Sequence, residues 1–135
     1  MLALGIVTDA LRNIGVISET ETPSAEQGAD GVRKLNELMA SLAEDGIELG
    51  WPQIADTSVS VSIPLGEVRT IKALLAINMA PIYGAVVTEP VAAVAGAGYT
   101  RMLRNAMLLA QRPASLWTVS HGEGSESTYD IQRGY

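Results

Sequence analysis

The sequence contains no cysteine and no phenylalanine, and it has a single histidine. Without cysteine there is no disulfide, no thiolate metal ligand and no cysteine nucleophile. Because only two tryptophans and four tyrosines are present, the core is expected to be aliphatic. No apolar run approaches the ~20 residues that span a bilayer, so we expect no membrane segment. The N-terminus also lacks the basic start of a secretory signal, and we expect synthesis in the cytoplasm.

Basic charge is scarce in the first part of the chain. The net charge is −6, and residues 1–50 hold nine acidic and three basic side chains, whereas residues 51–135 hold six of each. An acidic surface repels phosphate, so tight binding to nucleic acid is disfavoured, although passage of DNA through an acidic channel is not. The length of 135 residues predicts one domain with a modest core.

Hydrophobic periodicity predicts two helices in the acidic part. Apolar residues at helical spacing mark about Leu2–Asn13. After a polar loop, Ser24 and Gln27 have the spacing of a capping box, which predicts a second helix that ends near Asp45. Its expected buried residues are Ala25, Ala29, Val32, Leu35, Leu38 or Met39, and Leu42.

Two further helices are predicted after residue 65. The third covers about Gly66–Ala80 and is expected to break at Pro81, with closure at Gly84. Its expected buried residues are Val68, Ile71, Leu74, Leu75, Asn78 and Ile82. The fourth covers about Thr88–Ala110, and Arg112-Pro113 would end it. Its small residues at 92–98 predict close packing on a neighbouring helix.

A β element and an extended segment complete the expected organisation. Residues 57–63 alternate polar and apolar side chains, which is typical of a strand, and the partner is either residues 47–56 or another chain. The predicted fold is therefore mainly α: a four-helix bundle-like domain over residues 1–111 with a short β-hairpin or strand at 57–63. An extended C-terminal tail follows over residues 112–135.

The sequence shows no set of residues typical of a catalytic site. His121 lies in a Ser-His-Gly setting without a paired carboxylate, and no histidine zinc motif is present. Acidic residues cluster beside loops at 19–21 and 44–48, where solvated helix ends are the plainer interpretation and a divalent-ion site the alternative. We expect no enzyme, no cofactor and no metal; a small metal-dependent enzyme that uses a carboxylate site remains the third hypothesis.

The C-terminal tail carries the strongest interaction signal. Half of the aromatic residues lie in it, outside the expected core, and exposed aromatics suggest anchors that are buried on a partner. The alternative is a tail whose aromatics have no partner. The candidate docking residues are Arg112, Leu116, Trp117, Val119, Tyr129, Ile131 and Tyr135.

Three basic residues are candidates for contacts between copies of the chain. Arg101 and Arg104 lie on adjacent faces of the fourth helix, and Lys72 lies on the third. One interpretation is a solvated face, paired with acidic residues of the second helix. The other is a subunit contact, in which these cations meet the acidic first part of a neighbouring copy.

Several motifs follow one another in a set order. They are Ala10-Leu-Arg-Asn-Ile-Gly-Val16, the long helix with Leu35-Asn36 and Asp45-Gly46-Ile47, the β segment ending in Pro64-Leu65, and Ala80-Pro81 before Tyr83-Gly84. In this order they resemble the head-to-tail adaptor (head completion or tail accessory) proteins of tailed bacteriophages, especially podophages. The resemblance covers roughly residues 4–110. The chain departs from it at Leu42, where family members often have tryptophan.

The resemblance implies a structural virion protein at the head–tail junction. Such adaptors form a ring of about twelve copies beneath the portal ring, extend the DNA channel and carry the tail, and their C-terminal tail docks on the portal. The implied partners are the portal ring, neighbouring copies, and tail nozzle or tail fibre or spike proteins. Genomic DNA would pass without sequence-specific binding, and no membrane is involved. The runner-up hypothesis is a small helical DNA-binding regulator.

Overall fold

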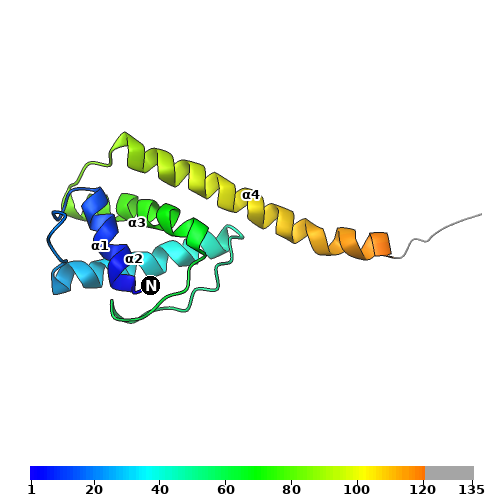
Figure 1. Cartoon of the computed structure of the whole chain (residues 1–135), viewed down its shortest axis with the longest axis horizontal. Helices are drawn as coiled ribbons and strands as arrows, with labels where there is room; N and C mark the ends of the chain where they lie inside the picture. Colours follow the sequence, from blue (N-terminus) through cyan, green and yellow to red (C-terminus); the bar gives the residue numbers. More distant parts are fainter. Residues whose placement is uncertain (121–135) are drawn as a thin grey trace, which may run out of the picture. The chain divides into compact units, whose positions relative to one another are not determined.

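The computed structural model describes residues 1–120, with the side chains of residues 1–111. Its helices are α1 (Ala3–Asn13), α2 (Ala25–Glu44), α3 (Val68–Tyr83) and α4 (Glu89–Ser120), and a short 3-10 helix, η1 (Leu65–Glu67), leads into α3 (Figure 1). The predicted fold class, mainly α and bundle-like, is confirmed. The chain divides into two units with a boundary inside α4, after Leu103. The division into domains 1–111 and 112–135 stays a prediction.

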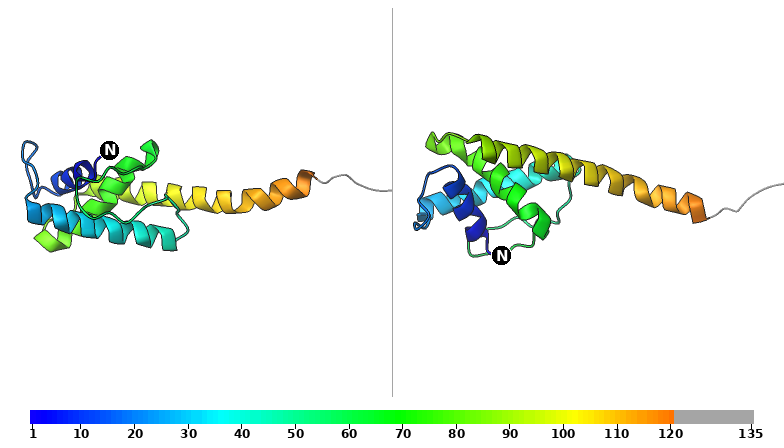
Figure 2. Two further views of the ribbon diagram at one scale, coloured as in Figure 1. Left: turned by 90° about the horizontal axis from the view of Figure 1, so that it is seen from below. Right: turned by 45° about the horizontal axis from the view of Figure 1, so that its top comes forward.

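The core of the first unit lies among α1, α2 and α3. Helix α1 packs against both of the other helices, and Figure 2 shows this arrangement from two further sides. The core is aliphatic, as the composition predicted, and Trp51, Tyr83 and Tyr99 are only half buried. The largest fully buried side chains are Ile6, Val7 and Leu11 of α1, Leu35 of α2, and Ile71, Leu75 and Met79 of α3.

Two glycines allow helices to approach closely. A Cβ added at Gly31 of α2 would overlap the side chain of Val7 on α1, and one added at Gly98 of α4 would overlap Thr70 of α3. Thr70 is 3% exposed, so it has little room to move away. The close packing predicted for the small residues of α4 therefore occurs at Gly98, whereas a Cβ on Gly96 would meet open space.

The buried face of α2 differs from the predicted stripe at its start. Ala25 and Ala29 are exposed, and Gly28 and Gly31 are buried instead. The physical reason is that two neighbours approach this side of α2 closely: a Cβ on Gly31 would overlap Val7 of α1, and a Cβ on Gly28 would lie 3.2 Å from the side chain of Thr57. In α3, likewise, Asn78 and Ile82 are exposed, and Ala73 and Met79 are buried.

The predicted strand at 57–63 is wrong for the described residues. This segment forms only an isolated antiparallel bridge, between Leu2 and Ser60. Its partner is the N-terminus: the Ala3 amide donates to the Val59 carbonyl at 3.0 Å, and the Val61 amide donates to the Met1 carbonyl at 2.8 Å. Because α1 begins at Ala3, the pairing with residues 59–61 ends there on the helix side.

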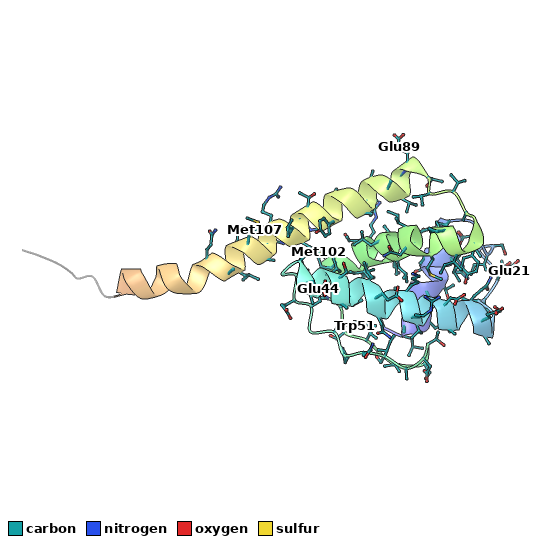
Figure 3. The ribbon with its side chains drawn as sticks, turned by 180° about the vertical axis from the view of Figure 1, so that it is seen from behind. Glu21, Glu44, Trp51, Glu89, Met102 and Met107 are labelled. Atoms are coloured by element: carbon teal, nitrogen blue, oxygen red, sulfur yellow. The ribbon has the colours of Figure 1, made fainter. Side chains whose placement is uncertain are left out.

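The side chain of Asn36 on α2 holds the first part of the connection between α2 and α3 in place. Its amide nitrogen donates to the Ile54 carbonyl at 2.9 Å, and its oxygen accepts from the Ile54 amide at 3.1 Å. The same oxygen accepts from the Trp51 indole nitrogen at 3.0 Å. Trp51 thus lies beside α2 (Figure 3), and the irregular segment gains a fixed path without regular secondary structure.

Helix α3 does not end at Pro81 as predicted, but continues to Tyr83 and closes at Gly84, which has the left-handed φ of 62° that was expected there. Proline removes one amide donor, yet its fixed φ is compatible with a helix. The last turn is held from outside, because the Tyr83 hydroxyl donates to Asp30 of α2 at 3.1 Å. Burial and this hydrogen bond raise the pKa of Tyr83 to about 12.

Helix α4 also runs past its predicted end. The expectation that Arg112-Pro113 stops the helix and that an extended tail begins at residue 112 is wrong up to Ser120, because α4 is helical to that residue. Residues such as Ala110, Gln111, Ala114 and Leu116 favour helix on both sides of the proline. They offset its cost of about 3 kcal/mol, which comes from a lost hydrogen bond and from crowding of the carbonyl four residues earlier. Four of the candidate docking residues therefore lie on a helix, while Tyr129, Ile131 and Tyr135 lie outside the described residues.

Replacing Gly98 with alanine is expected to lower the free energy of unfolding by about 1–3 kcal/mol, because the new Cβ overlaps the buried Thr70. The matched control is Gly96→Ala on the same helix, which meets nothing within 4 Å and should raise stability by up to about 1 kcal/mol. Urea unfolding of both variants checks the pair. Equal effects would contradict close packing at Gly98.

Replacing Asn36 with aspartate is expected to lower the free energy of unfolding by about 2 kcal/mol, because the new carboxylate faces the Ile54 carbonyl with no donor between them. The control is Asn78→Asp on the exposed side of α3, which should change stability by less than about 0.5 kcal/mol. Thermal unfolding followed by circular dichroism measures both. A neutral Asn36→Asp variant would show that the connection does not depend on this amide.

Candidate interaction surface

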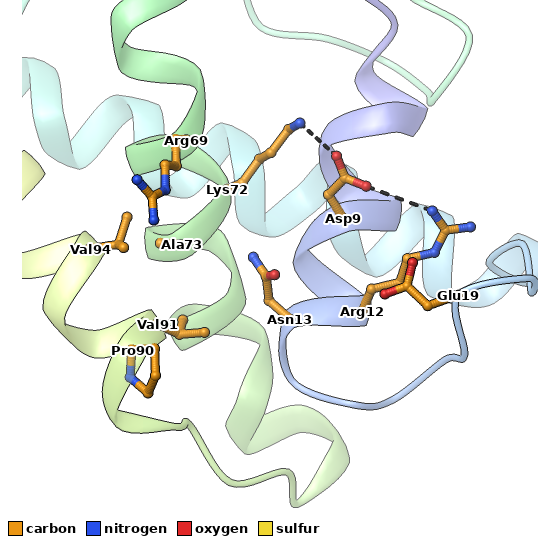
Figure 4. Close-up of a pocket in the computed structure, with 10 residues that line it drawn as sticks. All are labelled: Asp9, Arg12, Asn13, Glu19, Arg69, Lys72, Ala73, Pro90, Val91 and Val94. Atoms are coloured by element: carbon orange, nitrogen blue, oxygen red, sulfur yellow. Dashed lines mark hydrogen bonds and ion pairs between the residues drawn. The ribbon is translucent and has the colours of Figure 1, made fainter.

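An ion pair between α1 and α3 forms the centre of the surface. The Lys72 ammonium lies 2.6 Å from the Asp9 carboxylate, and the Arg12 guanidinium lies 3.8 Å from the other oxygen of Asp9 (Figure 4). Arg12 also donates to the carbonyls of Ser18 and Glu21, at 3.3 and 3.0 Å. The carboxylate thus joins two helices, and Arg12 ties the following loop to α1.

A cavity of about 400 Å³ opens beside this ion pair. One wall carries the charged and polar side chains of Asp9, Arg12, Asn13 and Lys72, and the other carries apolar side chains of α4, Val91 and Val94 among them (Figure 4). Arg69 of α3 also lines it, and no ion pair of Arg69 occurs within the described residues. Glu19 lines the cavity as well, so three basic side chains and two carboxylates lie beside the apolar wall, with one positive charge in excess.

A second cavity, of about 390 Å³, lies between the start of α3 and the middle of α4 and is lined by Arg69 and Arg101. The Arg101 guanidinium contacts Glu67 at 2.7 Å, the Gly66 carbonyl at 3.2 Å and the Thr70 hydroxyl at 3.3 Å. Because Arg69 lines both cavities, the basic side chains form one surface. We call Arg12, Arg69, Lys72 and Arg101 the basic face.

Acidic side chains gather on a different part of the first unit. Glu37, Glu44 and Glu48, on the exposed side of α2 and just after it, are all exposed. A hydrogen bond from Lys34 holds the pKa of Glu37 below its usual value, so this carboxylate stays ionised. Asp45 accepts a hydrogen bond from the Tyr99 hydroxyl at 2.8 Å, and this bond raises the pKa of Tyr99. We call Glu37, Glu44, Asp45 and Glu48 the acidic face.

These surfaces combine charged side chains with apolar ones. Among residues 1–120, no group of acidic or histidine side chains is arranged to hold a metal ion. No helix in the described part of the chain is long and apolar enough to cross a membrane. His121 lies outside the described residues. What the described residues offer is a set of cations and carboxylates beside an apolar wall.

The three predicted contact cations lie in different surroundings in the structure. Lys72 and Arg101 are both paired within their own chain, Arg101 with Glu67 of η1 rather than with α2. Arg104 is exposed on α4, beyond the first unit. Their contacts with a neighbouring copy stay a prediction. Sequence reasoning missed Arg69, although its spacing of three residues from Lys72 on an exposed helix face was a usable signal.

A family model described as "P22 tail accessory factor" matches residues 3–131 of the chain. Because the match spans nearly the whole length, the chain belongs to this family. It is a tail accessory protein of a tailed bacteriophage, structural in role and associated with the virion. A search of curated proteins gave no match.

Replacing Lys72 with glutamine is expected to lower the free energy of unfolding by no more than about 1 kcal/mol, because its pair with Asp9 is partly exposed to solvent. The loss should shrink as salt is added. Arg69→Gln is the matched control, since Arg69 lies one turn away on α3 and has no ion pair among the described residues, and it should be neutral. Urea unfolding at low and high salt distinguishes the two, and equal losses would contradict the role of Asp9.

Proposed function

We propose that this member of the P22 tail accessory factor family is a head-to-tail adaptor. Copies of it form a ring beneath the portal ring, extend the channel through which DNA passes, and provide the platform on which the tail assembles. The observation that carries the proposal is the family match over residues 3–131, which agrees with the order of the motifs in the sequence. The head–tail junction of the virion is the location that this function requires.

The separation of charge within one chain supports a ring. In a ring, the same two surfaces of the subunit meet at every interface, so opposite charges on the two surfaces attract in the correct arrangement and repel in others. The first unit carries the basic face on α1, α3 and α4 and the acidic face at α2. Lys72, Arg101 and Arg104 are the predicted contact residues, and Arg69 joins them because it lacks an ion pair in the described residues.

The composition of α4 and of the residues after it supports docking on the portal. Met107, Leu108 and Leu109 are 57%, 53% and 62% exposed. Three adjacent exposed apolar side chains are a common feature of surfaces that bind another protein. They precede the docking residues on the same helix, Arg112, Leu116, Trp117 and Val119, and the predicted docking residues Tyr129, Ile131 and Tyr135 follow further along the chain.

The acidic balance of the chain fits a DNA conduit better than a DNA-binding regulator. An acidic lining repels the phosphate backbone, so DNA slides past without being held. Tail nozzle and tail fibre or spike proteins are the partners proposed for the side of the ring opposite the portal.

Deleting residues 112–135 is expected to abolish binding to the portal ring and to leave the helical domain folded. The reason is that every buried core residue described lies at or before Met102, so the deletion removes docking residues and no core. Light-scattering mass and electron microscopy of the protein mixed with its virus's portal ring measure binding, and circular dichroism measures folding. A second truncation, which removes residues 121–135 alone, separates the helical docking residues from the later ones.

Two outcomes would contradict this proposal. Undiminished portal binding by the chain ending at Gln111 would show that residues 112–135 do not dock on the portal. Failure of the full-length chain to add a ring to the portal at low and moderate salt would exclude the adaptor function. Salt-dependent binding to duplex DNA by the same sample would then favour the regulator instead.

A further inference from the structure

Leu65 is the most exposed of the large apolar side chains described, at 89%. It begins η1, directly after Pro64, where the chain enters α3. A flexible exposed leucine needs no explanation, since single apolar residues are common on protein surfaces. Leu65 differs because the turn that carries it is held in place.

Several interactions brace this turn. The Glu67 amide donates to the Pro64 carbonyl at 2.8 Å and closes η1. From α4, Arg101 reaches across to the Gly66 carbonyl at 3.2 Å and to the Glu67 carboxylate at 2.7 Å. The backbone on both sides of Leu65 is thereby fixed before any partner binds. Ordering a contact residue in advance lowers the entropy lost on association.

An apolar groove of about 560 Å³ lies elsewhere on the same unit. It is formed by the start of α1, the first half of α2 and the chain near residue 57, and the apolar side chains in it include Leu4, Pro23, Ala25, Ala29 and Val32. Ala25 and Ala29 are the residues that the sequence pattern predicts as buried and that the first unit itself leaves exposed. Their apolar surface is therefore available to another chain.

Charges beside the two features are complementary. Arg69 follows Leu65 by four residues at the start of α3, and Asp56 lines the groove. Neither has an ion pair within the described residues. Two hydrogen bonds from Ser58 hold the pKa of Asp56 below its usual value, so it carries a full negative charge at neutral pH. An apolar contact flanked by this pair would be attractive in one orientation only.

The two features also lie at opposite ends of the helix pair. Helices α2 and α3 run in opposite directions in the views of Figures 1 and 2, so the start of α2, with its groove, is distant from the start of α3, with Leu65. Leu65 cannot fill the groove of its own chain in this arrangement. A contact between different surfaces of identical chains is heterologous, and it generates a ring when the rotation closes.

We propose that Leu65 of one copy inserts into the groove lined by Ala25 and Ala29 of the next copy, with Arg69 paired to Asp56 across the contact. This inference rests on the proposed ring and names the two surfaces that build it. The basic and acidic faces orient neighbouring copies, and the leucine in its groove fixes their register.

The absence of cysteine from the natural chain allows a direct test. One batch of full-length protein carries Leu65→Cys and another carries Ala29→Cys; the two are mixed, assembled on the portal ring and oxidised. We expect a disulfide-linked heterodimer from the mixture, and a ladder of larger multimers when one chain carries both substitutions. The matched control replaces Leu65→Cys with Val86→Cys, which is similarly exposed at 81% and lies after α3. It should give little product.

A second measurement does not depend on cross-linking. Leu65→Ser should weaken the addition of copies to the portal-bound ring by about tenfold, and Val86→Ser should leave it unchanged. If a ring forms on the portal but Cys variants at 65 and 29 do not cross-link above the Val86→Cys control, the contact is wrong and the adaptor function stands. If the unchanged protein forms no ring, both are wrong.

Discussion

The close contact between Val7 of α1 and Gly31 of α2 is the constraint on which the rest of the first unit depends. Helix α1 is only eleven residues long, yet it contributes fully buried side chains to the core it shares with α2 and α3. A side chain at Gly31 would hold the two helices apart, since a Cβ there has no space. With α1 in this position, Met1 and Ala3 reach the chain at 59–61, and Asp9 reaches Lys72. One close approach therefore organises the core, the long connection and one wall of the basic face.

The ion pairs of the basic face orient side chains more than they stabilise the fold. Pairs with solvent exposure of this kind contribute about 1 kcal/mol or less, because water and salt screen them. A weak internal pair can exchange its carboxylate for one on a neighbouring molecule at small cost. In the ring that we propose, such exchange would keep the charges of the free monomer paired and give the assembled ring charge complementarity. The apolar contact that we infer at Leu65 would then fix the register of neighbouring copies, which charges alone do not define.

The sequence predicted the part of the candidate surface that consists of basic residues on helices. Lys72 and Arg101 were identified from their positions on helices, and the structure brings both to cavities on the same side of α3. Arg69 was missed although it lies three residues from Lys72 on the same helix, and only the tertiary structure shows that it has no ion pair among the described residues. The groove was missed for a related reason. Ala25 and Ala29 have the spacing of buried residues, and only the positions of α1 and Thr57 show that the glycines beside them are buried instead.

The sequence by itself determined the helical class, the aliphatic core, the capping box at Ser24 and Gln27, and the left-handed glycine that closes α3. Each of these depends on interactions within a few residues or on composition alone. Tertiary structure decided whether Pro81 ends a helix, because Asp30 of α2 holds Tyr83 in the last turn. It also decided that residues 57–63 pair with the N-terminus, and which face of α2 is covered. These outcomes depend on contacts between segments far apart in the chain, and local propensity is weaker than the hydrogen bonds and packing that such contacts provide.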